Sequence, residues 1–472
     1  MSRRNKEQPI IEDICIEGVA AEGKAMAHID GKVVFVPFVV PGDVVDIKLL
    51  KQKKTYCEGK MVAVKRPSQL RIKPVCPHFG ICGGCKWQTL KYEEQLKAKQ
   101  QQVVDNLERL GNVDCSKISA ICGSDRVVRY RNKLEYTFST KAWKASIDSP
   151  DEQDGALGFH IPGMFDKVLN IDSCILQPEL SDRIRLHVRE YAKQNGLAYY
   201  DIRNHTGFLR NLVVRNTEEG EWMVIVIVAE DKNELLIPLL KSISDKFSEV
   251  TSLQYIVNSK MNDSYGDLDV KLYSGSPYIT ERMRKYDGQG YLEFRINPKS
   301  FYQTNSQQAQ KLYSFVADFA ELSGDEVVYD LYTGTGTIAQ FVAGMCKKVV
   351  GIEYVPEAIA DARINAENNG IANVTFFDGD MAQILTDDFV TQNGTPDVVI
   401  TDPPRAGMHE KVVKQLLNMA PRKIVYVSCN PATQARDLKL LSDLYEVGRI
   451  QPVDMFPHTQ HIENVVELNR KK

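Results

Sequence analysis

Short apolar runs alternate with helical stretches through the last third of the chain, residues 296–472. The runs are rich in valine and isoleucine, which is typical of buried strands. They begin at Val327, Lys348, Val374, Asp397 and Ile424. Because strands that alternate with helices form parallel sheets, we predict a doubly wound, Rossmann-like α/β domain here.

The first two thirds carry different patterns. Residues 10–66 contain short apolar strands separated by glycine turns, which predicts a small β-barrel domain over residues 1–66. Apolar residues at helical spacing predict a helix over 89–111. Mixed strands and helices, with a buried strand at 222–228, predict a central α+β domain over 67–295.

The composition is that of a soluble globular protein, with 43% hydrophobic and 26% charged residues among 472. No apolar run approaches the roughly 20 residues that a membrane span needs, and the polar N-terminus predicts no secretory signal. We therefore expect a cytoplasmic protein. Its ten cysteines are then expected to be ligands, nucleophiles or core residues rather than disulfides.

Positive charge is concentrated in the first 150 residues, which carry 26 Lys and Arg against 17 Asp and Glu. Lysines cluster at one predicted hairpin, and basic residues alternate with apolar ones further on. The first group is Lys48, Lys51, Lys53 and Lys54, and the second is Arg126, Arg129, Arg131 and Lys133. We expect the second group to form a cationic row on one strand. The pattern suits a polyanion such as RNA, although a solvated basic surface would look the same.

Three cysteines form a C-x5-C-x2-C cluster at Cys76, Cys82 and Cys85. Thiolates held by proline and glycine turns predict a metal site, with zinc or an iron–sulfur cluster as the candidates. A fourth ligand is normally needed. Both His78 and the distant Cys174 qualify.

Glycines and acids follow the predicted strands of the last third. The turn Gly334-Thr-Gly336 follows the first strand, Glu353 ends the second, and Asp380 and Asp402 follow the next two. Acids at such tips accept hydrogen bonds from a ribose or an adenine. The turn is shorter than a dinucleotide fingerprint, so we favour S-adenosylmethionine over a dinucleotide.

A further strand ends at Ser428-Cys429-Asn430-Pro431, where Pro431 closes it. Cys429 is therefore expected at the lip of a central strand, where open α/β sheets place their reactive groups. A lone cysteine is more often a small buried hydrophobe. The polar, turn-forming neighbours favour a nucleophile here.

Several motifs together resemble the RNA uracil-5 methyltransferases. They are Phe301-Tyr-Gln303-Thr-Asn305, Asp330-Leu-Tyr332-Thr-Gly-Thr-Gly336, Gly351-Ile-Glu353, Asp402-Pro-Pro-Arg405-Ala-Gly407, Ser428-Cys429-Asn-Pro-Ala-Thr433 and Asp454-Met-Phe-Pro-His458-Thr-Gln-His461-Ile-Glu463. The N-terminal strands resemble the RNA-binding TRAM domain. With the cysteine cluster, they make the chain look like the branch that methylates 23S ribosomal RNA.

The resemblance implies roles for particular residues. It implies a [4Fe–4S] cluster on Cys76, Cys82, Cys85 and Cys174, which favours Cys174 over His78. It implies contacts with S-adenosylmethionine from Gln303, Tyr332, Thr337, Glu353, Asp380 and Asp402; Thr337 stands where some relatives carry asparagine. It implies a nucleophile at Cys429 and a base at Glu463, and it implies that helix 89–111 packs with the catalytic domain.

Uracil carbon 5 is too weak a nucleophile to take a methyl group unaided, so we hypothesise that Cys429 adds to carbon 6 and Glu463 later removes the carbon-5 proton. Arg405 and Asp402 would orient the thiolate or the ring. The target would be a uridine flipped out of folded RNA. We read the cluster as structural and expect a monomer with no obligate protein partner.

Three alternatives remain. The same chemistry could act on tRNA, the chain could be a non-catalytic RNA-binding protein, or the cluster could serve a radical reaction with S-adenosylmethionine. Intact Cys429 and Glu463 count against the second alternative, and the cysteine spacing counts against the third.

Overall fold

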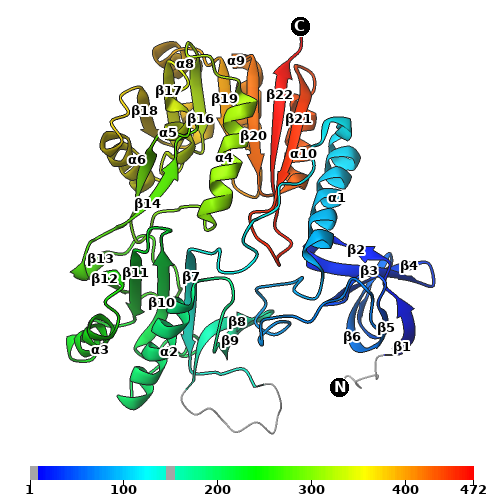
Figure 1. Ribbon diagram of the computed structural model, residues 1–472, viewed down its shortest axis with the longest axis vertical. Coiled ribbons are helices and arrows are strands. Elements are labelled where there is room, and N and C mark those ends of the chain that lie inside the picture. Colours follow the sequence, from blue (N-terminus) through cyan, green and yellow to red (C-terminus); the bar gives the residue numbers. More distant parts are fainter. Residues whose placement is uncertain (1–8, 145–154) are drawn as a thin grey trace.

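The computed structural model describes residues 9–144 and 155–472, arranged as an N-terminal lobe, a central sheet with two helices, and a C-terminal α/β unit (Figure 1). The N-terminal lobe is a six-stranded sheet in the order β1-β5-β6-β4-β3-β2. Its strands are β1 (Ile10–Cys15), β2 (Gly18–Val19), β3 (Lys24–Ile29), β4 (Lys32–Pro37), β5 (Val44–Gln52) and β6 (Tyr56–Arg66). Alternate residues such as Val34 and Val36 point into its core, and the residues between them face outwards.

The central sheet has seven strands in the order β13-β12-β11-β10-β7-β8-β9. They are β7 (Lys133–Ser139), β8 (Ala156–Ile161), β9 (Met164–Asn170), β10 (Leu209–Asn216), β11 (Trp222–Val228), β12 (Val250–Val257) and β13 (Val270–Gly275). Helices α2 (Glu179–Gln194) and α3 (Asn233–Lys246) pack together against it. Every residue of β11 is buried, as the continuous apolar run at 222–228 predicts.

The predicted cationic row is wrong. Strand β7 begins only at Lys133, and the residues before it are irregular. Arg129 adopts a left-handed backbone (φ +56°) and its guanidinium donates to the carbonyls of Cys174 and Gln177. Arg131 donates to the carbonyl of Lys133. Both guanidiniums therefore bind the protein's own backbone instead of forming a row on one strand face.

A hairpin of β14 (Ile279–Arg284) and β15 (Tyr291–Ile296) joins the central sheet to the C-terminal unit. Its apolar side chains, such as Phe294, belong to the same core as helix α4 (Ser306–Ala320). Asn365 also accepts a hydrogen bond from the backbone amide of Arg295. The core thus runs continuously across the boundary predicted near residue 295.

The C-terminal sheet has the order β18-β17-β16-β19-β20-β22-β21, with β22 antiparallel to its neighbours. Its strands are β16 (Val327–Leu331), β17 (Lys348–Glu353), β18 (Val374–Asp378), β19 (Val398–Thr401), β20 (Lys423–Ser428), β21 (Tyr445–Val453) and β22 (Glu463–Arg470). Its remaining helices are α5 (Thr337–Ala343), α6 (Pro356–Asn368), α7 (Met381–Ile384), α8 (Asp387–Asn393), α9 (Glu410–Met419) and α10 (Pro431–Leu441). Alternate strand residues enter two separate cores, one with α4, α5 and α6 and the other with α7, α9 and α10. The sheet is therefore covered on both faces, as predicted.

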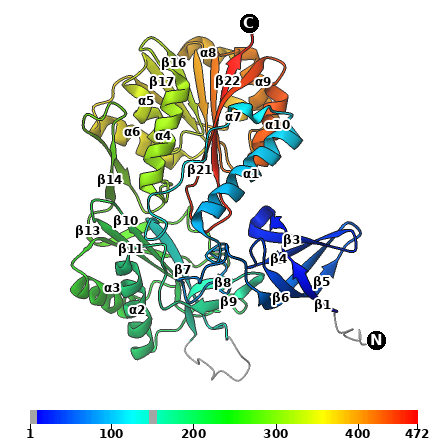
Figure 2. The same ribbon diagram turned by 45° about the vertical axis from the view of Figure 1, so that its right-hand side comes forward.

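Helix α1 (Tyr92–Gly111) leaves the N-terminal half of the chain and packs on the C-terminal unit, beside α10 (Figure 2). Val103 and Leu107 enter the same core as Ala435. A Cβ at Gly111 would lie 3.1 Å from the carbonyl oxygen of Ala435, so a larger residue there would require α1 and α10 to shift by a few tenths of an ångström. No helix within the described ranges is long and apolar enough to cross a membrane.

Candidate active site

The strand ends of the C-terminal sheet bring the predicted site residues to one edge. The parallel strands β16, β17, β19 and β20 all point the same way, so the residues that follow them share that edge. Strand β22 runs in the opposite direction, and therefore its first residue lies at the same edge. The register pairs Ser428, the last residue of β20, with Asn464. Cys429 directly follows Ser428, and Glu463 directly precedes Asn464, so both residues lie next to this pair.

The environment of Cys429 is acidic on one side and basic on the other. Burial, followed by the carboxylates of Glu463 and Asp402, raises the pKa of its thiol to about 11, and Arg405 opposes this rise. An unassisted thiol here would be protonated at neutral pH. The guanidinium of Arg405 is the group that favours the thiolate.

Glu463 is buried, only 6% exposed, and its pKa lies well above the ordinary range. Burial is the main cause, the charge of Asp402 adds to it, and Arg405 opposes it. Burial and the neighbouring Asp330 raise the pKa of Asp402 to about 7. Acids with raised pKa values take up protons readily near neutral pH, which suits general-base work.

The loop that carries Asp402 and Arg405 is tied to the segment after Cys429. The carbonyl oxygen of Arg405 accepts hydrogen bonds from Asn430 Nδ2 (3.0 Å) and Thr433 Oγ1 (3.2 Å). On its other side, Arg405 Nη2 lies 3.3 Å from His461 Nδ1. Burial, and then the charge of Arg405, lower the pKa of His461 to about 4, so this imidazole is neutral.

The glycine turn after β16 contacts the segment that carries Gln303. Thr335 Oγ1 lies 3.5 Å from the carbonyl oxygen of Phe301. Thr337 begins α5, and its hydroxyl lies 3.0 Å from that of Tyr313 on α4. Gln303 is only 9% exposed, and the backbone carbonyl of this residue accepts a hydrogen bond from Asn132 Nδ2 at 3.0 Å. The contact between Thr335 and Phe301 joins the two motifs, and the other two contacts fix each motif to a neighbouring segment.

The remaining predicted donor contacts lie along the same edge. Glu353 accepts hydrogen bonds from the backbone amides of Gly334 (3.1 Å) and Val355 (3.0 Å), which fixes its carboxylate beside the glycine turn. Tyr332 adopts a left-handed backbone at φ +63°. Asp380 caps α7 by accepting from the amide of Ala382 (3.0 Å). These three residues flank the turn, as a nucleotide site in an open α/β sheet requires.

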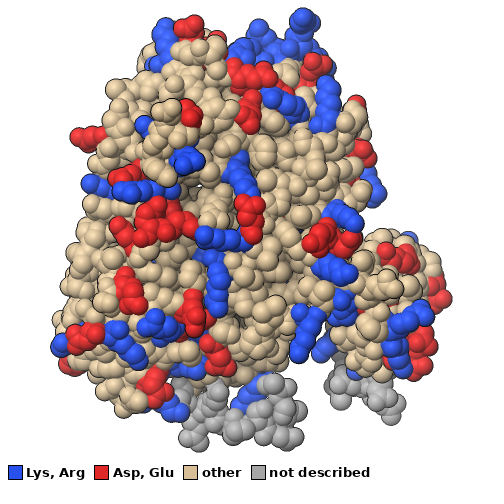
Figure 3. All heavy atoms as spheres, viewed as in Figure 1, with Lys and Arg blue, Asp and Glu red and all other residues tan. Residues whose placement is uncertain are grey.

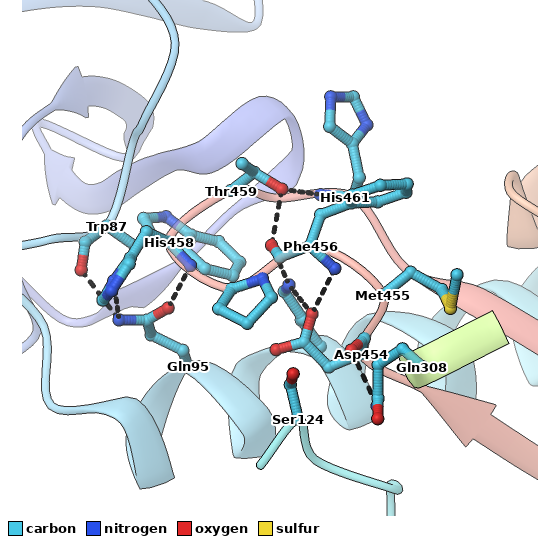
Figure 4. Close-up of polar contacts among 12 residues, drawn as sticks. Trp87, Gln95, Ser124, Gln308, Asp454, Met455, Phe456, His458, Thr459 and His461 are labelled. Atoms are coloured by element: carbon cyan, nitrogen blue, oxygen red, sulfur yellow. Dashed lines mark hydrogen bonds and ion pairs between the residues drawn. The ribbon is translucent and has the colours of Figure 1, made fainter. Parts of the chain in front are cut away.

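The loop between β21 and β22, residues 454–462, carries polar contacts that the sequence reading did not identify (Figure 4). Lys99 Nζ lies 2.6 Å from Asp454 Oδ1, with both side chains fully buried. Gln95 Oε1 accepts from the amide of His458 at 2.9 Å. The sequence does carry a pattern that indicates these contacts, because Gln95 and Lys99 stand four residues apart on the same helix face as the apolar Val103 and Leu107. Polar residues in line with an apolar stripe are buried and need partners.

The four predicted cluster cysteines come near one another. The charges of Cys174, Cys82 and Cys76 add to burial in raising the pKa of Cys85 to about 12. Within the described ranges, however, no three His, Cys, Asp or Glu side chains form a group that could hold a metal ion. The Nε2 atom of His78 accepts from the amide of Asp172 at 3.0 Å. The iron–sulfur ligands therefore stay a prediction.

Comparison with family models finds two matches. Residues 11–62 match the TRAM domain, and residues 267–471 match the tRNA (Uracil-5-)-methyltransferase model. The first confirms the N-terminal TRAM domain of strands. The second begins ahead of the predicted boundary near 295, where the continuous core already includes β14 and β15.

Curated relatives extend the similarity to nearly the whole chain. An uncharacterized RNA methyltransferase of Bacteroides thetaiotaomicron is 53% identical over 457 residues, covering 95% of this chain and 99% of the relative. One from Porphyromonas gingivalis is 53% identical over 467 residues, covering 96% and 99%. One from Chlorobaculum tepidum is 38% identical over 442 residues, covering 92% and 90%.

Among solved structures, the fold resembles the Pyrococcus abyssi tRNA (uracil-54, C5)-methyltransferase in complex with S-adenosyl-L-homocysteine. The TM-score is 0.75 at 28% identity, covering 97% of this chain and 100% of that one. The α/β fold is therefore that of an S-adenosylmethionine-dependent methyltransferase. Taken with the relatives and the two family models, this shows that the chain belongs to the RNA uracil-5-methyltransferase family and carries a TRAM domain at its N-terminal end.

Proposed function

We propose that this protein methylates carbon 5 of a uridine through a covalent bond between Cys429 and carbon 6 of the ring. The observation that carries the proposal is the pairing of β20 with β22, which sets a cysteine and a buried glutamate side by side at one strand edge. A thiol and a carboxyl with a raised pKa, beside a methyl-donor fold, match the needs of this reaction.

The steps follow from the residues. The Cys429 thiolate adds to carbon 6, and the ring becomes an enolate that is nucleophilic at carbon 5. Carbon 5 takes the methyl group from S-adenosylmethionine, which leaves as S-adenosylhomocysteine. Glu463 then removes the carbon-5 proton, and the electrons of that bond expel the thiolate and restore the ring. Arg405 favours the attacking thiolate, since its positive charge lowers the thiol pKa.

The donor contacts are proposed for Gln303, Tyr332, Thr337, Glu353, Asp380 and Asp402. Their positions around the glycine turn support this assignment. Thr337 is the weakest member, because its hydroxyl already contacts Tyr313 at 3.0 Å. Asp402 lies electrostatically close to both Glu463 and Cys429, so we assign it to the reacting ring as well as to the donor.

We propose 23S ribosomal RNA as the substrate, since the TRAM domain and the cysteine motif together resemble that branch of the family. Transfer RNA is the second candidate, because the structural neighbour from Pyrococcus abyssi is named as a tRNA enzyme and matches along the whole chain. In either RNA the uridine must leave its stack to reach Cys429.

We also propose that Cys76, Cys82, Cys85 and Cys174 hold a [4Fe–4S] cluster. Four mutually close thiols, one buried and three partly buried, lie beside Tyr130, Ile175 and Leu176 and form a sulfur-rich donor set. A cluster keeps its four thiolates further apart than a single ion does, which is compatible with the lack of a single-ion group among the described residues. When bound, the cluster would offset part of the negative charge of the thiolates and brace the surrounding segments.

Protein purified without oxygen is expected to be brown and to contain about four irons per chain. Cys85→Ser should lower the iron content and the melting temperature. Cys15→Ser, at an exposed cysteine of strand β1, should change neither. Colourless protein with no iron or sulfide after anaerobic purification would contradict the cluster proposal.

The function itself is tested with RNA that contains 5-fluorouridine, whose fluorine cannot leave as a proton does. Protein, S-adenosylmethionine and either a 23S fragment or tRNA are incubated and run on a denaturing gel. We expect a protein–RNA band with one of the two RNAs and none in Cys429→Ser. Absence of a band with both RNAs would contradict the proposed chemistry.

The proposed base is tested with ordinary uridine RNA. Glu463→Gln should accumulate the methylated adduct, and normal turnover by that variant would exclude Glu463 as the base.

A further inference from the structure

Groups from four distant segments hold the 454–462 loop in place. Five successive carbonyl oxygens, from Asp454 to His458, each accept a hydrogen bond from outside the loop. In order, the donors are Gln308 Nε2 (3.0 Å), Asn305 Nδ2 (2.9 Å), Lys99 Nζ (3.1 Å), Tyr130 Oη (3.0 Å) and the amides of Lys86 and Trp87 (2.8 and 3.1 Å). Because a buried backbone must find its partners, these donors specify the path of the loop.

Lys99 is the charged member of this set. Its ammonium contacts both the carboxylate of Asp454 (2.6 Å) and the carbonyl of Phe456 (3.1 Å), and Tyr92 Oη donates to the same carboxylate at 2.9 Å. A buried ion pair is weak evidence for stability, since apolar residues of equal volume often serve as well. Its distinguishing effect here is geometric, because one ammonium fixes the start of the loop at two atoms.

Gln95, one helical turn before Lys99, fixes the middle of the loop. His458 adopts a left-handed backbone at φ +67°, a conformation that a non-glycine residue keeps only when its surroundings impose it. Gln95 Oε1 accepts from the amide of His458, and its Nε2 lies 3.3 Å from His458 Nδ1 (Figure 4). The same Nε2 also donates to the carbonyls of Trp87 and Leu90.

The loop ends directly at the site. His461, near Arg405, precedes Ile462 and then Glu463, the first residue of β22. We propose that Lys99, supported by Gln95, is a positioning residue for Glu463, acting through the 454–462 loop. This inference rests on the proposed function. Lys99 then matters for removal of the carbon-5 proton more than for attack by Cys429, which stands at the end of a different strand.

The test uses Lys99→Met, which keeps the length of the side chain and removes its charge. Ordinary uridine RNA and methyl-labelled S-adenosylmethionine are used, and release of the covalent adduct is followed on denaturing gels. We expect formation of the labelled adduct at close to the normal rate and release slowed about 10- to 100-fold, as a small displacement of a reacting group produces. Lys97→Met, an exposed lysine on the same helix with a surface partner, should behave as the unaltered protein does.

Because Lys99→Met leaves Asp454 buried without its partner, a second variant, Lys99→Met with Asp454→Asn, removes both charges. This double variant should recover the melting temperature of the unaltered protein. It should still accumulate the labelled adduct, because in both variants the carbonyl oxygen of Phe456 lacks the hydrogen bond from Lys99. Normal release by either folded variant, or equal slowing of methylation and release, would overturn the proposal. Failure of both variants to fold would also overturn it, because Lys99 would then serve folding alone.

The unaltered protein with 5-fluorouridine RNA separates the two ideas. If it forms no adduct, the proposed function fails and the role of Lys99 fails with it. If it forms the adduct and the folded Lys99 variants release ordinary RNA normally, only the positioning role fails.

Discussion

At the scale of single residues, the site is defined by opposing charges around Cys429. Its thiol has a pKa of about 11, because burial and the carboxylates of Glu463 and Asp402 outweigh the guanidinium of Arg405. The thiolate fraction therefore rises with pH across the neutral range. Glu463, whose pKa is also raised, likewise becomes more ionised as the pH rises. Both effects predict that single-turnover methylation accelerates as the pH is raised from 6 to 9.

Arg405→Gln should raise the pKa of the Cys429 thiol further, since the positive charge that favours the thiolate is lost. At a fixed pH and saturating RNA, we expect adduct formation to slow by about 10- to 100-fold, equivalent to a pKa rise of about one to two units. The rate should keep rising to a higher pH than in the unaltered protein. Arg109→Gln, at an exposed arginine of α1, is the control. An unchanged pH profile would show that Arg405 does not act on the thiol.

At the scale of elements, the loop between β19 and α9 is held by α10. Asp437 on α10 accepts from the amide of Met408 (2.8 Å) and from Tyr426 Oη (2.7 Å), and Arg436 donates to the carbonyls of Ala406 and Met408. These bonds link the loop that carries Asp402 to the helix that starts just after Cys429. The two loops therefore keep a fixed relation to one another.

Gly407→Ala tests this link. The glycine has φ +78°, and a Cβ there would lie 2.6 Å from Arg436 Nη2 and 2.7 Å from Asp437 Oδ2. We expect a loss of about 1 to 3 kcal/mol in the free energy of unfolding and slower methylation, because the loop must move. Gly370→Ala is the matched control: its φ is +64° and nothing lies within 4 Å of the added Cβ. It should cost about 1 kcal/mol and leave methylation unchanged. Equal effects of the two substitutions would exclude the clash as the cause.

At the scale of the whole molecule, basic side chains gather at the junction of the N-terminal lobe with the main body, on the face seen in Figure 3, and the lobe itself carries both basic and acidic side chains. The hairpin of β5 and β6 carries Lys51 near the end of β5 and Lys53 and Lys54 in its turn, all exposed. The TRAM domain is an RNA-binding module, and lysines on a strand hairpin bind phosphates without reading sequence.

Replacing these three lysines by glutamine should weaken RNA binding and reduce the slope of log affinity against log salt concentration by about 2 to 3. Binding of S-adenosylmethionine should not change, because its proposed contacts lie in the C-terminal unit. Glutamine at the exposed helix lysines Lys97, Lys241 and Lys414 is the control. An unaltered salt slope would exclude this hairpin from the RNA interface.

The sequence predicted the elements better than it predicted their contacts. The C-terminal strands, the glycine turn and the acids at strand ends could be read from local patterns, because period and turn chemistry are local properties. The nearness of Cys429 and Glu463 could not, since it depends on β22 running antiparallel beside β20. The strand predicted around Arg129 was wrong because basic and apolar residues alternate there as they do in a strand. The guanidiniums of Arg129 and Arg131 instead bind backbone carbonyls. The contact of Lys99 with Asp454 joins residues 355 positions apart, beyond the reach of any local pattern.

The antiparallel placement of β22 has a consequence for how an RNA would be chosen. Nucleophile and base belong to neighbouring strands of one sheet, so no movement between lobes changes their separation. On the proposed function, the uridine must leave its stack to reach this pair of residues, and the cost of unstacking it enters its rate directly. Selection among uridines then depends on how weakly the surrounding RNA holds each one, as well as on the surface that binds it.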